Sequence, residues 1–399
     1  SYNITEPSVT GYTPSYEGCS GIVIAAGGEA TCTITNNDDP AHLIVIKNVD
    51  NGTTGATTVS GDFTMTINSL TASGGNSFPG VATTGTDKTL TSVGTYSVTE
   101  TGPSGYIASY STDCSGTIAL GETKTCTVTN TAIAPKLTVI KEVNNLFNGS
   151  KLVSDFSLYV GSTGVTSGAT NSFSVGSYKV TETGGAGYSA SFSGACDSKG
   201  NVSLALGDDL TCTITNSALP GTLTVTKTVI GGTADREDFA FSVNGDTPIN
   251  FRTDGINTFN VDRGTYTITE NAGPDYVASY VGCDSVFINN GGSATCAITN
   301  TRKTGNLYLD KIIFAGPAVD SDWYFEIRSL TGALLGTLQD GGSINLETGS
   351  YTITESTGVL GYTLTSVGGA CSTLNGQSAT ATVGAGDQTC SFTNVRDTG

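Results

Sequence analysis

Short segments in which apolar and polar residues alternate run along the whole chain. Residues 137–141 read Leu-Thr-Val-Ile-Lys, and because successive side chains of a β-strand point to opposite faces, the lysine shares a face with leucine and valine. Residues 178–182 read Tyr-Lys-Val-Thr-Glu, and residues 212–216 read Cys-Thr-Ile-Thr-Asn. These segments therefore predict strands that carry a lysine, a glutamate and an asparagine on otherwise apolar faces.

The three segments recur four times in the same order. Their polar residues are Lys47, Glu100 and Asn130, then Lys141, Glu182 and Asn216, then Lys227, Glu270 and Asn300, then Lys311, Glu355 and Asn394. A buried charge without a partner costs roughly 3 to 5 kcal/mol. Four such triplets therefore indicate a chemical reason for placing the three residues in one core.

The recurring segments divide the chain into β-sandwich repeats of about seven strands each. The predicted domains are residues 37–130, 131–216, 217–300 and 301–399, preceded by a partial repeat at 1–36. Gly supplies 53 residues and aromatic residues only 8%, a composition that favours strands and turns, so we expect almost no helix. The predicted fold class is all-β, a tandem array of immunoglobulin-like β-sandwiches. Short connections such as residues 131–136 favour an elongated rod.

Residues 1–36 contain only the second half of a repeat, with Glu6 and Asn36 but no lysine strand. They could belong to a longer array, receive a strand from a neighbouring subunit, or form a degenerate cap. The chain contains four strands that carry the lysine, but five half repeats that carry the glutamate and the asparagine. Exchange of strands between identical chains would therefore leave one half repeat without a lysine strand. We therefore favour a longer tandem protein.

Ten cysteines occur as one pair in each repeat, with the second cysteine four residues before the asparagine. The pairs are Cys19 with Cys32, Cys114 with Cys126, Cys196 with Cys212, Cys283 with Cys296, and Cys371 with Cys390. This regular pairing predicts disulfides and an extracellular location. A zinc site needs about four ligands, which one cysteine pair and the single histidine, His42, do not supply, so we expect no metal.

The charge and composition of the chain disfavour several classes of binding partner and function. There are 35 acidic and 17 basic residues, a net charge of −18, and no basic cluster, which disfavours nucleic acid and anionic membranes. No segment reaches the apolar length of a membrane span. One histidine provides no Ser-His-Asp set, and no glycine-rich phosphate loop is present, so we expect no cofactor and no turnover enzyme.

The triplets suggest a single reaction. Burial disfavours charged forms, so a lysine and a glutamate enclosed together can exist as free amine and protonated acid. The amine can attack a neighbouring asparagine carboxamide while the acid polarises the carbonyl and carries a proton to departing ammonia. The product is a Lys-Asn isopeptide bond. The alternative is a buried hydrogen-bonded network that only fixes strand register, and in the last repeat Asp310 could draw the amine of Lys311 outward.

The order Leu-x-Val-x-Lys, Tyr-x-Ile-Thr-Glu with a following Gly-Tyr, and Thr-Cys-Thr-Ile-Thr-Asn resembles the Cna-B-type, or SpaA-like, prealbumin-fold repeats of microbial surface adhesins and pilins. The resemblance implies prealbumin-like (transthyretin-like) sandwiches. It also implies cross-linking between the lysine and asparagine of each triplet, with the glutamate as the autocatalytic acid; only Glu6 and Asn36 match in the partial repeat. The disulfide in every repeat departs from the commoner pattern of that family.

We therefore expect an extracellular, cell-surface structural protein, such as a fibre, stalk or adhesin shaft. Its partners would be neighbouring repeats of the same or a longer chain, with a homopolymeric fibre as one form. An alternative is an adhesive ligand-binding module that uses the variable middle of each repeat, for example residues 68–94. Few aromatic residues are available there for a binding surface, and no ligand is indicated.

Overall fold

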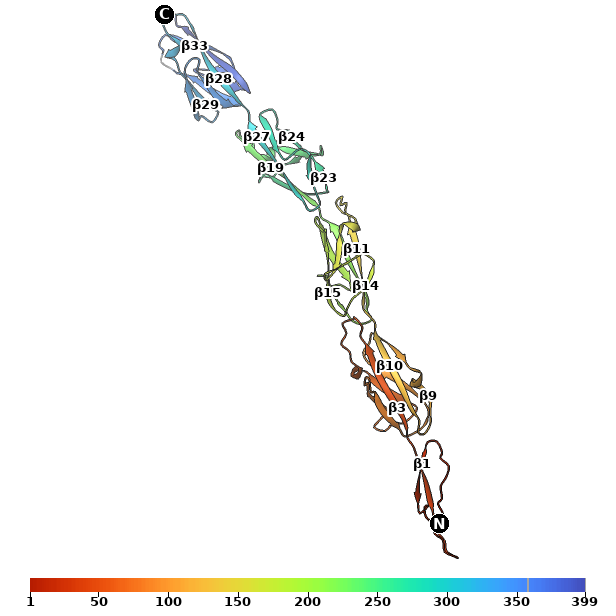
Figure 1. The fold of residues 1–399 in the computed structure, drawn as a ribbon. Coiled ribbons are helices and arrows are strands. Elements are labelled where there is room, and N and C mark those ends of the chain that lie inside the picture. Colours follow the sequence, from red (N-terminus) through yellow and green to blue (C-terminus); the bar gives the residue numbers. More distant parts are fainter. Residues whose placement is uncertain (357–358, 399) are drawn as a thin grey trace. The chain divides into compact units, whose positions relative to one another are not determined.

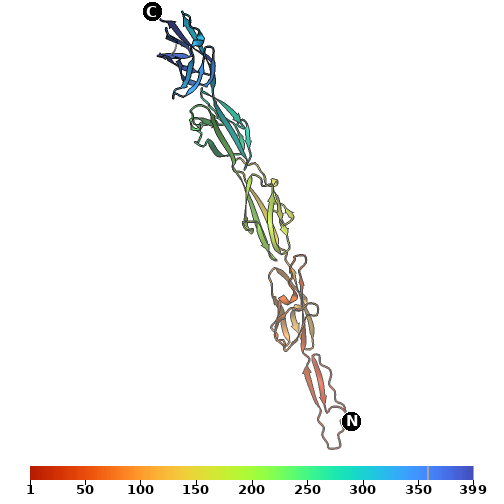
Figure 2. The same cartoon turned by 90° about the vertical axis from the view of Figure 1, so that its left-hand side faces the viewer.

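The computed structural model describes residues 1–356 and 359–398, and in these residues the chain is built from β-strands (Figures 1 and 2). The described helices are single 3-10 turns: η1 Ser60–Asp62, η2 Thr112–Cys114, η3 Val153–Asp155, η4 Arg236–Asp238 and η5 Asp320–Asp322. The predicted all-β class and its tandem sandwiches are confirmed.

The first complete repeat has two four-stranded sheets that face each other across an apolar core. One sheet has the order β6-β3-β10-β8 and the other has the order β5-β4-β7-β9. The strands are β3 Ala41–Asp50, β4 Thr64–Asn68, β5 Ser77–Pro79, β6 Thr86–Leu90, β7 Gly94–Thr101, β8 Tyr106–Tyr110, β9 Ser115–Ile118 and β10 Thr123–Ala132. In β3, buried and partly exposed residues alternate as the sequence predicts, and the buried set includes Leu43, Val45 and Lys47.

The second repeat has the same two-sheet plan, with orders β14-β11-β18-β16 and β13-β12-β15-β17. Its strands are β11 Lys136–Asn144, β12 Ser157–Val160, β13 Thr163–Val165, β14 Thr170–Ser172, β15 Gly176–Thr183, β16 Tyr188–Gly194, β17 Asn201–Leu204 and β18 Asp209–Ala218.

The third repeat keeps the four-stranded sheet β22-β19-β27-β25 and divides the opposite layer into β21-β20-β24 and β23-β26. Its strands are β19 Gly221–Ile230, β20 Ala240–Val243, β21 Ile249–Asn250, β22 Ile256–Val261, β23 Gly264–Tyr266, β24 Ile268–Glu270, β25 Tyr276–Val281, β26 Val286–Ile288 and β27 Ser293–Arg302.

The fourth repeat pairs β31-β28-β36-β33 with a five-stranded sheet, β30-β29-β32-β35-β34. Its strands are β28 Thr304–Phe314, β29 Phe325–Ser329, β30 Leu334–Leu338, β31 Ser343–Glu347, β32 Gly349–Glu355, β33 Tyr362–Gly369, β34 Cys371–Asn375, β35 Ser378–Val383 and β36 Gly386–Arg396. The complete repeats therefore have eight or nine described strands. The expectation of about seven was too low because edge strands such as β5, β13 and β21 have only two or three residues, too few for alternation to be recognised in the sequence.

The first and last strands of every complete repeat lie side by side and run parallel. In the first repeat Lys47 is opposite Val128, and Asn130 is opposite Val49. The same register recurs in the other three pairs, β11 with β18, β19 with β27, and β28 with β36. The lysine and the asparagine therefore lie on one face of adjacent strands, offset by two residues, in all four repeats.

The glutamate comes from the opposite sheet. Glu100 ends the buried face of β7, where it pairs with Met65 of β4, and Glu355 pairs with Phe325 of β29 in the last repeat. Because the two sheets pack face to face, the glutamate side chain reaches the lysine and the asparagine across the core.

The five predicted disulfides are present. In the complete repeats each joins a buried cysteine near the start of the last hairpin to a buried cysteine of the last strand. In the third repeat the bend before Cys283 requires Gly282, which has φ +67° and whose missing Cβ would lie 2.7 Å from the carbonyl oxygen of Thr295. The bend turns Cys283 toward the core. The five bonds themselves confirm the pairing inferred from the spacing.

The chain divides into two compact units. The first comprises Ser1–Asn144, Lys151–Gly185 and Ser189–Ser217, and the second comprises Asn145–Ser150, Ala186–Tyr188 and Ala218–Gly399. The partial repeat belongs to the first unit and contains a two-stranded sheet of β1 Tyr12–Glu17 and β2 Thr33–Asp38. The elongated rod stays a prediction.

Replacing both Cys283 and Cys296 by serine should lower the free energy of unfolding of the third repeat by about 3 kcal/mol, because the disulfide closes a short loop in the unfolded chain. Hydrogen exchange of the β25 and β27 amides in the full chain measures this change. Ser293→Ala, at an exposed position of β27, is the control and should leave exchange unchanged. Equal exchange in the double variant and the control would contradict a stabilising role.

Candidate functional site

The four predicted lysines are buried, each with its ammonium group beside the predicted glutamate. The distance from lysine Nζ to the nearest glutamate carboxylate oxygen is 3.1 Å for Lys47, 3.2 Å for Lys141, 2.6 Å for Lys227 and 2.9 Å for Lys311. All four lysine side chains are fully inaccessible to solvent. Asp310 therefore does not draw the amine of Lys311 to the surface.

The asparagines are also buried, and in three repeats the side-chain amide donates a hydrogen bond to the same glutamate. Asn216 Nδ2 lies 2.5 Å from Glu182, Asn300 Nδ2 lies 2.6 Å from Glu270, and Asn394 Nδ2 lies 3.0 Å from Glu355. In the third repeat the amine and the amide both contact one oxygen, Oε1 of Glu270. The carboxylate therefore holds amine and amide next to each other.

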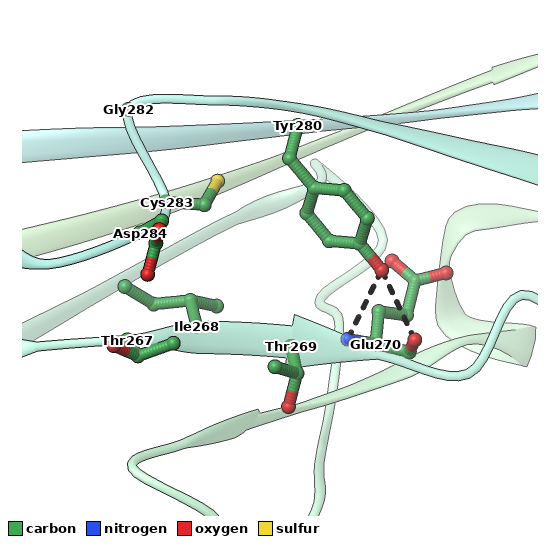
Figure 3. A pocket seen from close by; sticks show the side chains of 8 residues that line it. All are labelled: Thr267, Ile268, Thr269, Glu270, Tyr280, Gly282, Cys283 and Asp284. Carbon is green, nitrogen blue, oxygen red and sulfur yellow. Dashed lines mark hydrogen bonds between the residues drawn. The ribbon is translucent and has the colours of Figure 1, made fainter.

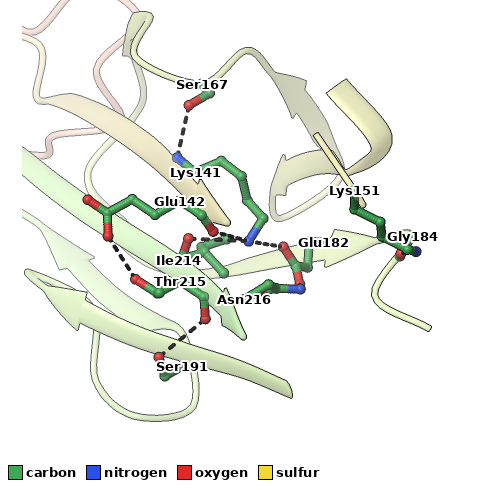
Figure 4. Close-up of polar contacts among 10 residues, drawn as sticks. All are labelled: Lys141, Glu142, Lys151, Ser167, Glu182, Gly184, Ser191, Ile214, Thr215 and Asn216. Atoms are coloured by element: carbon green, nitrogen blue, oxygen red, sulfur yellow. Dashed lines mark hydrogen bonds and ion pairs between the residues drawn. The ribbon is translucent and has the colours of Figure 1, made fainter. Parts of the chain in front are cut away.

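The second repeat shows how the backbone assists this arrangement (Figure 4). Lys141 Nζ donates to the carbonyl oxygen of Glu142 at 3.1 Å and to that of Ile214 at 3.3 Å, besides its contact with Glu182. Lys311 makes the matching bond to Phe392 in the fourth repeat. The first repeat differs, since among the described residues no hydrogen bond joins Asn130 to Glu100.

Each asparagine leaves its carbonyl oxygen unused. The Oδ1 atoms of Asn130, Asn216, Asn300 and Asn394 are buried and have no hydrogen-bond partner among the described residues. Burying an unpartnered carbonyl oxygen costs about 1 to 3 kcal/mol. This unpartnered oxygen recurs in all four complete repeats.

Burial changes the acidity of the lysines. The pKa of Lys47, Lys141, Lys227 and Lys311 is lowered from its ordinary value because the surroundings exclude water, and this outweighs the opposing hydrogen bond and attraction of the glutamate. A lower pKa increases the fraction of uncharged amine, which is the form able to act as a nucleophile.

An aromatic ring lies against the amine in every complete repeat, a contact that the sequence did not reveal. Lysine Nζ is 4.3 Å from the ring centre of Phe63, 4.4 Å from those of Phe156 and Phe239, and 4.6 Å from that of Trp323. In the sequence an aspartate directly precedes each of these aromatic residues. In the structure the aspartate ends a 3-10 turn; Asp62, for example, accepts a hydrogen bond from the backbone NH of Val59.

Tyrosines hold the surroundings of the site in place. The ring of Phe63 packs edge-on against Tyr106, and Trp323 packs in the same way against Tyr362. In the third repeat the Tyr280 hydroxyl accepts a hydrogen bond from the backbone NH of Glu270 at 3.3 Å and donates to its carbonyl at 3.0 Å (Figure 3). This contact lines a surface hollow beside the site and fixes the backbone of the glutamate.

The partial repeat does not assemble the triplet. Glu6 is half-buried and Asn36 is exposed, and no hydrogen bond or ion pair joins them in the described part of the chain. Among the described residues there is no cluster of three or more His, Cys, Asp or Glu that could hold a metal, and no helix there is long and apolar enough to cross a membrane.

The sequence of the chain matches a protein-family model, described as a prealbumin-like fold domain, in three stretches: residues 38–134, 132–214 and 218–298. The chain belongs to this family. The three matches cover the first three complete prealbumin-like repeats, and the fourth has the same strand register and buried triplet. The suspected resemblance is therefore confirmed.

The chain also matches solved structures, all at low sequence identity. The Bacillus anthracis TIE protein is 16% identical, with 99% of this chain and 74% of that chain covered and a TM-score of 0.45. Two B repeat units of the collagen binding protein of Staphylococcus aureus are 14% identical, with 90% of this chain and 99% of that chain covered and a TM-score of 0.19. The minor pilin of Streptococcus agalactiae is 14% identical, with 45% of this chain and 97% of that chain covered and a TM-score of 0.21. No curated protein matches the chain in sequence.

The Glu270→Gln substitution should destabilise the third prealbumin-like repeat by about 3 kcal/mol or more, because it leaves the buried amine of Lys227 without a countercharge. Faster hydrogen exchange of the paired strands β19 and β27 would report the loss. Glu237→Gln, at an exposed position in the same repeat, should change exchange little. Equal behaviour of the two variants would show that the buried carboxylate does not support the core.

Proposed function

We propose that the protein is an extracellular structural protein, a surface fibre, stalk or adhesin shaft, whose prealbumin-like repeats are closed by Lys-Asn isopeptide bonds. The cross-links join Lys47 to Asn130, Lys141 to Asn216, Lys227 to Asn300, and Lys311 to Asn394. The strongest support is one repeated geometry, in which a desolvated amine and a carboxamide contact the same buried carboxylate.

The reaction follows from these contacts. The uncharged lysine Nζ attacks the asparagine Cγ, forming a C–N bond, and the bond from Cγ to Nδ2 breaks as ammonia departs. Protons pass from the amine to the leaving group through the glutamate, which touches both nitrogen atoms in three repeats. No electrons are gained or lost. In this proposal the glutamates Glu100, Glu182, Glu270 and Glu355 act once each, and no repeated turnover is expected.

The bond would connect the two strands on which mechanical force acts. Each lysine lies on the first strand of its repeat and each asparagine on the last, and the two strands pair in parallel. Tension along the chain pulls on both strands, and the cross-link would carry it without opening the sandwich. The disulfide adds a second cross-link, because its cysteine lies four residues before the asparagine on the last strand.

Location and assembly follow from the same features. Five disulfides and no free cysteine among the described residues are typical of an oxidising environment outside the cytosol. Because the chain is a tandem array of prealbumin-like domains, we propose a cell-surface position and assembly into a fibre with neighbouring repeats. Ligand binding by the variable middle segments stays an untested alternative.

The intact mass of the reduced full chain should be lower than the sequence mass by four molecules of ammonia, one for each complete repeat. Replacing Asn130, Asn216, Asn300 or Asn394 by alanine should each prevent one of the four ammonia losses. The measured mass should then be three ammonia molecules below the mass calculated for the variant sequence. Asn250→Ala is the matched control at an exposed position and should retain all four losses. A mass equal to the plain sequence would exclude the bonds and leave only a hydrogen-bonded network.

A further inference from the structure

The third and fourth repeats lie in one compact unit, and a single residue, Lys303, joins the last strand of one to the first strand of the other. Its backbone NH donates to the carbonyl oxygen of Asp275 in the third repeat at 2.9 Å. Its carbonyl oxygen accepts from the backbone NH of Thr348 in the fourth repeat at 2.8 Å. The backbone of the connecting residue is therefore bound by both repeats at once.

The side chain of Arg302 also contacts both repeats. In the third repeat its Nη1 lies 3.2 Å from the carboxylate of Asp275, and its guanidinium group lies 5.2 Å from the ring centre of Tyr276. In the fourth repeat its Nε donates to the carbonyl oxygen of Thr348 at 3.2 Å. The side chain is 18% exposed, so one largely enclosed, planar cation bridges the two repeats.

A second charged group holds the repeats together beside the linker. The carboxylate of Glu347, in the fourth repeat, accepts a hydrogen bond from the backbone NH of Gly232, in the third repeat, at 2.9 Å. The preceding Gly231 has φ +75°, and a Cβ there would lie 2.3 Å from Oε1 of Glu347. A glycine is therefore required for the loop to approach the carboxylate. We name the contacts among residues 231–232, 275–276, 302–303 and 347–348 the Arg302 junction.

The junction between the first and second repeats, inside the other compact unit, has the same plan. The backbone of Ile133 is hydrogen-bonded to Gly105 of the first repeat and to Gly207 of the second, each at 2.9 Å. Beside this linker, the backbone NH of Val175 donates to the carbonyl oxygen of Thr54 at 2.7 Å. These three bonds use only backbone atoms. The Arg302 junction follows this plan and adds three charged side chains to it.

We propose that the Arg302 junction is a charge-held lock between the third and fourth repeats, which opens without unfolding either repeat and lets the fourth repeat reorient. Its contacts join the surfaces of two repeats, whereas the cores around Phe241 and Phe325 lie within separate repeats. Ion pairs near the surface are weak and are screened by salt, so the junction opens more readily as the ionic strength rises. This inference concerns the linker and is independent of the proposed cross-links.

The sequence contains a probe of the open state. Arg302 and Lys303 are the only two basic residues that are adjacent in the sequence, and trypsin cleaves after lysine and arginine. In the closed junction the NH and the carbonyl oxygen of Lys303 are both hydrogen-bonded to the repeats, so a protease cannot bind this backbone. Cleavage after Lys303 therefore reports the fraction of molecules in which the junction is open.

The test is the initial rate at which trypsin cuts the purified full chain after Lys303, followed by the masses of the products. Glu347→Ala, which leaves the sequence around the cleavage site unchanged, should raise this rate about fivefold. Arg302→Gln should raise it by at least as much, because it removes contacts with both repeats. Arg328→Gln is the control, since it removes an exposed ion pair with Glu326 within the fourth repeat and should leave the rate unchanged.

Salt tests the role of charge. Raising the NaCl concentration from about 0.1 M to about 1 M shortens the screening length from about 10 Å to about 3 Å. The cut after Lys303 should then accelerate in the unmodified chain and much less in Arg302→Gln. The cut after Lys199, in an exposed turn of the second repeat, measures any effect of salt on trypsin itself.

Four results would overturn the lock. An unchanged rate in both junction variants would show that these side chains do not hold the repeats together. A cut after Lys303 as fast as that after Lys199 in the unmodified chain would show that the junction does not close. A rate that does not respond to salt, relative to Lys199, would exclude a charge-held contact. Loss of hydrogen-exchange protection in strands β19 and β28 of the variants would show that the repeats unfold instead.

Discussion

The structure depends on one constraint, that a lysine amine buried in each sandwich must share its pocket with a carboxylate. Removing the ammonium group from water is costly, and the glutamate from the opposite sheet offsets that cost at 2.6 to 3.2 Å. The amine, the acid and the amide come from three strands that are far apart in sequence. Their meeting therefore requires the complete fold, so the site can form only after the sandwich has closed.

Strand register makes this meeting reproducible. A shift of one residue would turn the lysine or the asparagine to the outer face of its strand, and the alternating apolar residues of the first and last strands prevent that shift. The aromatic ring on one side of the amine and the backbone carbonyls on the other define where Nζ lies. Core packing thus does the positioning, and the polar groups occupy the space that it leaves.

The arrangement gives the last strand of each repeat two fixed points. The disulfide attaches it to the preceding hairpin, and the triplet faces the first strand near the other end. In the proposed structural role, force applied between repeats would act mainly on these two strands. A scaffold of small domains, each with a modest core, gains more resistance from such links than from added apolar surface.

Much of this organisation could be predicted from the sequence because two-residue alternation and cysteine spacing are local signals. They revealed the repeats, the faces of Lys141, Glu182 and Asn216, and the five disulfide pairs. The ring of Phe63 above the amine was missed because its position depends on a 3-10 turn, and the tyrosine bond to the glutamate backbone depends on register across the hairpin. In the partial repeat the matching residues predicted a site, but no hydrogen bond or ion pair joins Glu6 and Asn36 in the described residues, where β2 pairs with β1 alone.

The central claim is that the buried triplets become covalent bonds, and tandem mass spectrometry of a reduced protease digest tests it most directly. The account predicts branched peptides that join the first and last strands of each complete repeat, for example the segments containing Lys227 and Asn300. Recovery of the same segments only as separate linear peptides, with unmodified lysine and asparagine, would contradict it.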